Sequence, residues 1–167
     1  MTINDAGKDR RSGGGLQREI KKKRPFESAE QEAVLNVMRT ADRFEIQFAR
    51  LFREYGLTGS QYNVLRILRG EGRPMPSLEV ADRMLSAVPG ITGLIDRLEG
   101  MGFVSRERCT EDRRVVYIAI TKPGKDVLAK LDEPVAELHE KLVGHLSKTE
   151  LKELSRLLEK ARRSLSE

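Results

Sequence analysis

The chain has 167 residues, of which 38% are hydrophobic and 34% charged, and its 31 Lys and Arg against 26 Asp and Glu give a net charge of +5. No apolar run reaches the ~18 residues of a membrane span, no apolar signal segment follows Met1, and a single cysteine excludes a disulfide framework. These features predict a cytoplasmic protein of one domain, with or without an extension.

The positive charge is concentrated at the amino terminus. Residues 1–25 hold eight basic and three acidic residues, a net charge of +5, so the other 142 residues sum to zero. The segment also contains the run Gly13-Gly14-Gly15 and the block Lys21-Lys22-Lys23-Arg24. We therefore expect residues 1–27 to be a disordered basic tail. Two roles stay open for it: a solvated tail, or an arm that contacts DNA phosphates or a partner subunit.

Helix signals follow in quick succession. A long helix is predicted for 28–56, because Ser28 and Gln31 fit a capping box and apolar residues then recur every three or four positions. Thr58 and Gln61 form a second capping box, opening a helix that we expect to close at Gly70. After a turn over 71–76, Ser77 is expected to cap a short helix.

The next segment has the pattern of a winged helix. An amphipathic helix is predicted for Ala87–Met101, and two β-prone runs, 103–108 and 115–120, then flank a polar stretch with two adjacent arginines. This arrangement places one helix in the major groove of DNA while the hairpin tip reaches the neighbouring groove. The pattern therefore indicates a DNA-binding protein.

Residues 122–167 are predicted to form two further long helices, the first capped by Thr121 and the second opened by a capping box at Ser147. With helix 28–56 they carry apolar stripes too long for one small core to cover. The expected fold is mainly α with a small β-hairpin wing. In the domain 28–167, residues 57–121 form the winged-helix DNA-binding lobe, and 28–56 and 122–167 are dimerisation helices. An intramolecular three-helix bundle is the alternative.

In a combination of motifs, the chain resembles the multiple-antibiotic-resistance regulator (MarR) family of winged-helix repressors. The motifs are Leu94-Ile-Asp-Arg-Leu-Glu99, Gly102-Phe-Val-Ser-Arg106, Glu111-Asp-Arg-Arg114 and Ile118-Ala-Ile-Thr121-Lys-Pro-Gly124. Their order matches the end of the recognition helix, the first wing strand, the wing tip, and the second strand with the next helix start. The resemblance implies a homodimeric transcriptional regulator bound to a pseudo-palindromic operator in double-stranded DNA, often released by a small aromatic ligand or by thiol oxidation.

On this resemblance, the start of the recognition helix faces base edges, with Ser86, Ala87, Val88, Pro89, Gly90, Thr92 and Gly93. Few of these residues can form bidentate hydrogen bonds, so we expect readout through thymine methyl groups and DNA shape. Arg113 or Arg114 is expected to enter the minor groove, with Asp96 and Asp112 bracing the wing. The alternative is that both arginines only pair with neighbouring acids. Ser60 and Ser77, at helix starts, are candidates for phosphate contacts or for plain caps.

Other site types receive little support. Phe44, Phe48 and Tyr62 are candidates to line a ligand pocket, or are plain core residues. His139 and His145 lie on different faces of one helix, and no nucleophile–base spacing is present, so we expect no metal, no cofactor and no enzyme. Cys109 is expected to be inert, which favours release by a ligand over release by oxidation. The alternative function is a helical dimeric interaction module whose winged helix binds protein rather than DNA.

Overall fold

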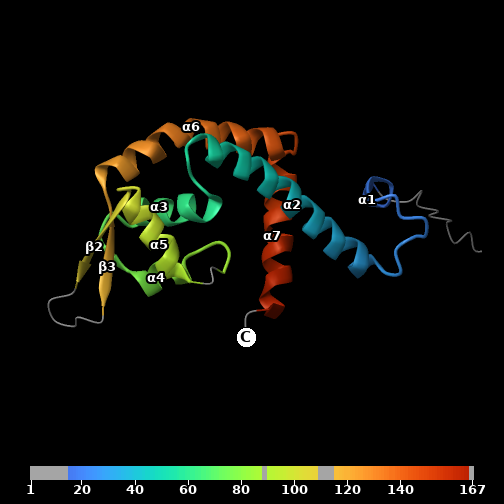
Figure 1. The fold of residues 1–167 in the computed structure, drawn as a ribbon. Coiled ribbons are helices and arrows are strands. Elements are labelled where there is room, and N and C mark those ends of the chain that lie inside the picture. The colour runs from blue at the N-terminus through green and yellow to red at the C-terminus, as the bar shows by residue number, and fades with distance from the viewer. Residues whose placement is uncertain (1–14, 88–89, 109–114, 166–167) are drawn as a thin grey trace, which may run out of the picture. The chain divides into compact units, whose positions relative to one another are not determined.

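The computed structural model describes residues 15–87, 90–108 and 115–165. The chain forms two compact units, Met1–Glu45 and Ile46–Glu167, which are described in turn. Figure 1 shows the elements: α1 (Gly15–Glu19), α2 (Ala29–Glu54), α3 (Gly59–Glu71), β1 (Met75–Pro76), α4 (Ser77–Asp82), α5 (Ile91–Gly100), β2 (Val104–Arg108), β3 (Val116–Ile120), α6 (Lys122–Val143), α7 (Lys148–Arg162) and η1 (Arg163–Leu165). The expected class, mainly α with a small wing sheet, is confirmed.

The first unit corrects the expected disordered tail from residue 15 onward. Gly15–Glu19 forms the short helix α1, and Leu16 within it is buried. The side-chain amide of Gln17 donates to the carbonyl of Lys22 at 3.2 Å, which closes the turn after the helix. The burial of Leu16 stabilises this segment. The prediction of disorder relied on the charge and glycine content of the segment and did not consider burial of a single leucine. The earlier part of the expected tail lies outside the described residues.

Helix α2 begins in this unit, close to its expected start. The Ser28 hydroxyl accepts from the Gln31 amide at 3.2 Å, as a cap should. The Gln31 side chain accepts from the amide of Glu27 at 2.9 Å, one residue before the position that a capping box requires. The first half of α2 exposes three large apolar residues, Val34, Val37 and Met38.

The second unit contains the winged helix. Its sheet has the order β1-β3-β2 with antiparallel pairing, and Arg106 in β2 and Met75 in β1 both pair with Ile118 in β3. Strand β1 replaces part of the turn that we expected over 71–76. Met75 is fully buried, whereas Pro76 lies on an edge strand, where its missing amide donor costs little.

Several helix ends differ from those expected. Helix α2 ends at Glu54, and α3 continues to Glu71 with Gly72 as its cap. Helix α4 begins at Ser77 itself, so this serine is not the cap. Helix α5, which the sequence predicted to be the recognition helix, begins at Ile91 instead of Ala87. Gly90 before it has φ +77°, a left-handed conformation that interrupts a right-handed helix.

The core of this unit lies between α3, α4, α5, the sheet and α6. Its fully buried side chains come from each of these elements: Val64, Leu65, Leu68, Met75, Val80, Ile95, Leu98, Ile118, Leu128 and Leu131. The end of α2 adds Phe52, whose ring stacks on Tyr62 with centroids 4.3 Å apart. The winged helix and the start of α6 therefore share one core.

Helix α6 is tied directly to the turn that joins α5 to β2. The amide of Thr121 donates to the Phe103 carbonyl at 3.0 Å, and the Thr121 hydroxyl donates to the Gly102 carbonyl at 2.7 Å. The same hydroxyl accepts from the amide of Gly124 at 3.3 Å, which caps α6 as expected. A Cβ on Gly124 would lie 2.3 Å from the Phe103 oxygen. Only glycine allows this close approach.

Helix α7 opens with the expected capping box between Ser147 and Glu150. It has 15 residues, shorter than predicted, and buries none of them. Leu154 and Leu157 are 40% and 48% exposed. Within the described parts of the chain, no helix combines the length and apolar character that crossing a membrane requires.

Candidate nucleic-acid interface

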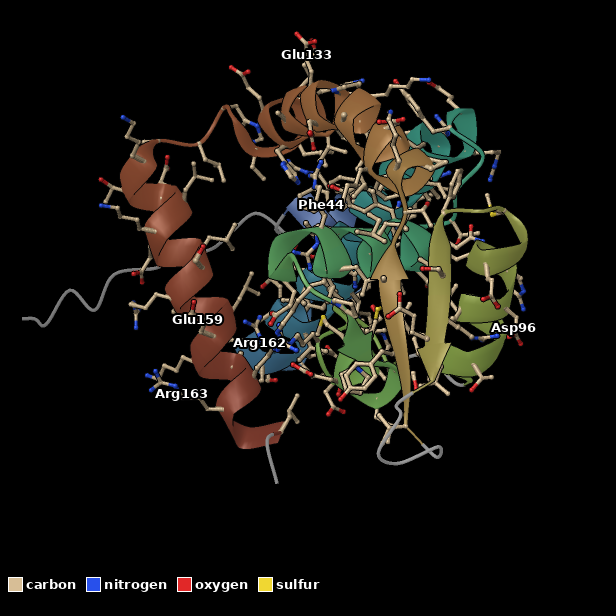
Figure 2. All side chains as sticks on the ribbon, turned by 90° about the vertical axis from the view of Figure 1, so that its left-hand side faces the viewer. Phe44, Asp96, Glu133, Glu159, Arg162 and Arg163 are labelled. Atoms are coloured by element: carbon tan, nitrogen blue, oxygen red, sulfur yellow. The ribbon has the colours of Figure 1, made fainter. Side chains whose placement is uncertain are left out.

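Helix α5 is amphipathic across its short length. Leu94, Ile95 and Leu98 are buried in the core, and this fixes the rotation of the helix about its axis. Thr92 and Asp96, one turn apart, are exposed, and Figure 2 shows Asp96 at the outer edge of α5. Burial of one face therefore presents the other to solvent, as a helix that enters a DNA groove requires.

The structure separates the residues expected at the start of the recognition helix. Ser86 and Ala87 are exposed but lie in the connection before α5, so they are not helical. Thr92 and Gly93 are in the first turn, and Gly90 precedes it. Val88 and Pro89 lie outside the described residues. The helical part of the predicted reading surface is therefore shorter than the sequence indicated.

Arg106 is the residue of this surface that sequence reasoning missed. Its guanidinium donates to Asp96 Oδ1 at 2.5 Å and to Glu99 Oε2 at 3.0 Å, and also to the backbone carbonyl of Thr92 at 3.4 Å. One side chain of the wing sheet thus contacts three positions on consecutive turns of α5. These contacts hold the wing against the recognition helix.

Asp96 pairs with Arg106 of β2, a partner that the sequence did not predict, and its expected contact with the arginines of the wing tip stays a prediction. Asp112, Arg113 and Arg114 lie outside the described residues, as does Cys109. The alternation of side chains along β2 is the sequence signal that could have identified Arg106. Val104 is buried, and Arg106, two positions later, lies on the same face of β2. Since that face packs on α5, the alternation directs Arg106 toward the helix.

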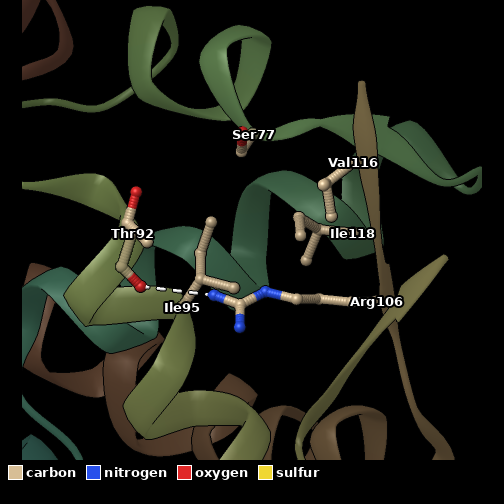
Figure 3. Close-up of a pocket in the computed structure, with 6 residues that line it drawn as sticks. All are labelled: Ser77, Thr92, Ile95, Arg106, Val116 and Ile118. Carbon is tan, nitrogen blue, oxygen red and sulfur yellow. Dashed lines mark hydrogen bonds between the residues drawn. The ribbon is translucent and has the colours of Figure 1, made fainter. Parts of the chain in front are cut away.

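A pocket of about 350 Å³ adjoins this arginine. Figure 3 shows that it lies between the start of α4, helix α5 and the sheet, with Ser77, Thr92 and Arg106 as polar lining and Ile95, Val116 and Ile118 as apolar lining. Because two carboxylates neutralise Arg106, the pocket is not a strong anion site. The pocket is instead a partly apolar groove between α5 and the wing sheet.

An ionic network fixes the helix-turn-helix. Arg83, after α4, pairs with Glu71 at the end of α3 and with Glu79 in α4, each at 2.5 Å. Arg73 in the intervening loop also pairs with Glu71 at 2.5 Å. The hydrogen bond from Arg83 lowers the pKa of Glu71, with Arg73 acting in the same direction, and the same bond raises the pKa of Arg83. The network holds α3 and α4 in a fixed arrangement.

The two serines at helix starts do not act as caps. The cap of α3 is Thr58, whose hydroxyl accepts from the Gln61 amide at 3.3 Å, and Ser60 is exposed beside it. Helix α4 has no side-chain cap, and Ser77 lines the pocket described above. The capping alternative is therefore excluded for both serines, and their contact with phosphate stays a prediction.

The aromatic residues proposed for a ligand pocket are half-buried. Phe48 and Tyr62 flank Phe52, with centroid distances of 5.8 Å and 4.3 Å, and all three rings pack on the core. Burial raises the pKa of the Tyr62 phenol. Phe44, labelled in Figure 2, belongs to the unit Met1–Glu45 and is half-buried there. Binding of a ligand by these residues stays a prediction.

Comparison with known proteins identifies the same region. A family model described as the MarR family matches residues 57–116. The chain is 28% identical over 112 residues to the homoprotocatechuate degradative operon repressor of Escherichia coli, an alignment that covers 67% of this chain and 75% of that protein.

Solved structures extend the similarity beyond the winged helix. A MarR transcription factor from Planctomyces limnophilus has 45% sequence identity and a TM-score of 0.64, with 80% of this chain and 98% of that chain covered. Sco3205 of Streptomyces coelicolor, a MarR family transcriptional regulator solved in complex with DNA, has 21% identity and a TM-score of 0.75, with coverage of 87% and 94%. The second likeness supports the fold alone.

Proposed function

Because this chain belongs to the MarR family of DNA-binding transcriptional regulators, we propose that it is a repressor that binds a pseudo-palindromic operator as a homodimer. The observation that carries the proposal is the three-point contact of Arg106 with α5, which joins wing and recognition helix into one rigid surface. A rigid pair of elements can enter two neighbouring grooves without further ordering, which lowers the entropic cost of binding.

Unpartnered apolar side chains support the homodimer. Helix α7 buries no residue and exposes Leu154 and Leu157, and the first half of α2 exposes Val37 and Met38. Burial of each such side chain contributes about 1.5–3 kcal/mol, so a second copy that covers them gains substantial stability. A two-fold dimer would place its two recognition helices on half-sites about 34 Å apart.

The wing tip is the part of the proposal that a substitution tests most directly. We propose that Arg113 or Arg114 enters the minor groove, with Ser60 and Ser77 near the phosphates. The contribution of the two arginines to DNA affinity can be measured by fluorescence anisotropy, with a labelled duplex from the DNA flanking the gene, at several salt concentrations. The double variant Arg113→Ala/Arg114→Ala should bind more weakly, with a salt slope smaller by roughly one unit per lost contact. An unchanged slope in a folded variant would contradict the proposed wing contact.

The repressor role and its relief are finer parts of the proposal. The name of the Escherichia coli relative supports repression, and a reporter under the gene's own promoter should rise when the gene is deleted. We propose release by a small aromatic ligand near Phe48 and Tyr62, since their rings already form an aromatic cluster. If peroxide releases the parent protein from DNA but not Cys109→Ser, the wing thiol is the sensor and the ligand proposal is wrong.

Two exposed leucines favour a second candidate, a module that binds protein. Leu78 in α4 and Leu85 after it are 73% and 84% exposed, and both lie in the helix-turn-helix. Apolar side chains there suit thymine methyl groups, but they also suit an apolar protein partner. If the parent protein fails to bind any duplex even at low salt, the second candidate replaces the first.

A further inference from the structure

The segment Arg18–Arg24, which we name the basic segment, carries five cations and one acid. The cations are Arg18, Lys21, Lys22, Lys23 and Arg24. The single acid, Glu19, already lies 3.6 Å from the guanidinium of Arg39 in α2. Its charge is therefore partly offset by a residue outside the segment, which leaves the basic segment strongly positive.

The basic segment is folded, and one of its cations maintains that fold. Leu16 is buried directly before it, and the amide of Lys22 donates to the carbonyl of Gln17 at 3.0 Å. The Lys22 ammonium donates to the carbonyl of Pro25 at 3.2 Å and lies 5.6 Å from the ring centroid of Phe26, within the range of a cation–π contact. Lys22 therefore has a structural role.

The other four cations are available for a partner. Arg18, Lys21, Lys23 and Arg24 are exposed, and none has an ion pair or side-chain hydrogen bond within the described parts of the chain. A folded turn that holds four unpaired cations loses less conformational entropy on binding than a free tail would. This arrangement favours a partner with closely spaced negative charges.

We propose that the basic segment is a second DNA-contacting surface, which binds the phosphate backbone of duplex DNA without reading bases. The inference rests on the proposed DNA-binding function and extends it to a part of the chain outside the winged helix. Duplex DNA carries one negative charge per ~1.7 Å of its axis, and each phosphate neutralised releases condensed counterions. Because residues 26–167 sum to zero net charge, the amino-terminal region supplies the protein's net attraction to DNA.

The composition of the segment favours duplex over single-stranded nucleic acid. Binding of single strands relies on aromatic side chains that stack on bases. The ring that contacts this segment, Phe26, is half-buried and already engaged by Lys22. Lysines acting as point charges suit phosphate oxygens. The contact should therefore strengthen binding to operator and random duplex alike.

The test compares two full-length variants that each remove four positive charges. The first is Arg18→Gln/Lys21→Gln/Lys23→Gln/Arg24→Gln, which keeps Lys22 and its contacts. The matched control replaces four exposed lysines of α6 and α7 that have no ion pair within the described residues: Lys125, Lys130, Lys141 and Lys148, each to Gln. Thermal melts followed by circular dichroism verify that both variants fold.

Binding is measured as log K against log salt, on the duplex that flanks the gene and on a random duplex of equal length. The basic-segment variant should lose about two to four units of slope on both duplexes, at roughly 0.9 unit per phosphate contact. The ratio of the two affinities should stay unchanged, and the control should keep the parent slopes.

An unchanged slope in the basic-segment variant, or an equal loss in the control, would overturn the inference. A loss confined to the flanking duplex would also overturn it, since the segment would then take part in base reading. If the parent itself binds neither duplex, the proposed DNA-binding function fails instead, so the two failures are distinguishable.

Discussion

Gly124 offers the sharpest test of how the winged helix is joined to α6. In Gly124→Ala, the new Cβ would lie 2.3 Å from the Phe103 carbonyl oxygen and 2.9 Å from Ile120 Cγ1. The oxygen belongs to the backbone and accepts from the Thr121 amide at 3.0 Å, so it cannot move away without weakening that bond. We expect a loss of about 1–3 kcal/mol from overpacking, against a gain of at most ~1 kcal/mol from the helix propensity of alanine.

Gly70→Ala is the matched control, because it makes the same chemical change inside α3. No atom lies within 4 Å of its ideal Cβ position, so alanine should stabilise the protein by about 0.5–1 kcal/mol. Urea unfolding at one fixed protein concentration gives both free energies of unfolding. We expect the free energy of unfolding to fall in Gly124→Ala and to rise in Gly70→Ala. A Gly124→Ala variant as stable as the parent would refute the argument that this joint requires glycine.

Three further predictions concern the interface and the dimer. Arg106→Met should lower operator affinity but change the free energy of unfolding by less than about 1 kcal/mol, because the Arg106–Asp96 pair is partly exposed. Anisotropy measures the affinity and urea unfolding measures the stability; unchanged affinity would contradict the bracing role of Arg106. Because the pKa of Glu71 is lowered in the folded state, its contribution to stability is present above its unfolded pKa and is lost as pH falls through the folded pKa. In thermal melts between pH 6 and pH 3, the melting temperature of Glu71→Gln should therefore fall less steeply with decreasing pH than that of the parent. Leu154→Arg should place a charge in the proposed dimer seam and lower the melting temperature by several degrees; a variant that melts like the parent would place the seam elsewhere.

Local signals explain what the sequence predicted correctly. The capping boxes at Thr58 and Ser147 are present because each needs only two residues that lie three positions apart. The family motifs likewise led to the correct order of α5, β2, β3 and α6. These features depend on neighbours along the chain, and a single sequence contains them.

The features that were missed depend on distant partners or on one backbone angle. Strand β1 consists of Met75 and Pro76 and forms only because β3, some forty residues later, pairs with it. Arg106 becomes part of the interface only once β2 packs on α5. The start of α5 depends on the left-handed conformation of Gly90, which the apolar periodicity around it does not report.

Because Thr121 is hydrogen-bonded to the Gly102–Phe103 turn, a tilt of α6 is transmitted to the wing. Two hydrogen bonds from Thr121 and the close backbone approach at Gly124 make the wing move with the first turn of the helix. With 22 residues, α6 is about 33 Å long at ~1.5 Å per residue. A tilt of about 5° at its far end therefore displaces the wing by about 3 Å, close to the ~3.4 Å rise of one base-pair step. Because the start of α6 shares its core with the winged helix, the two can move together without repacking that core, and the displacement is enough to shift the wing out of register with its groove.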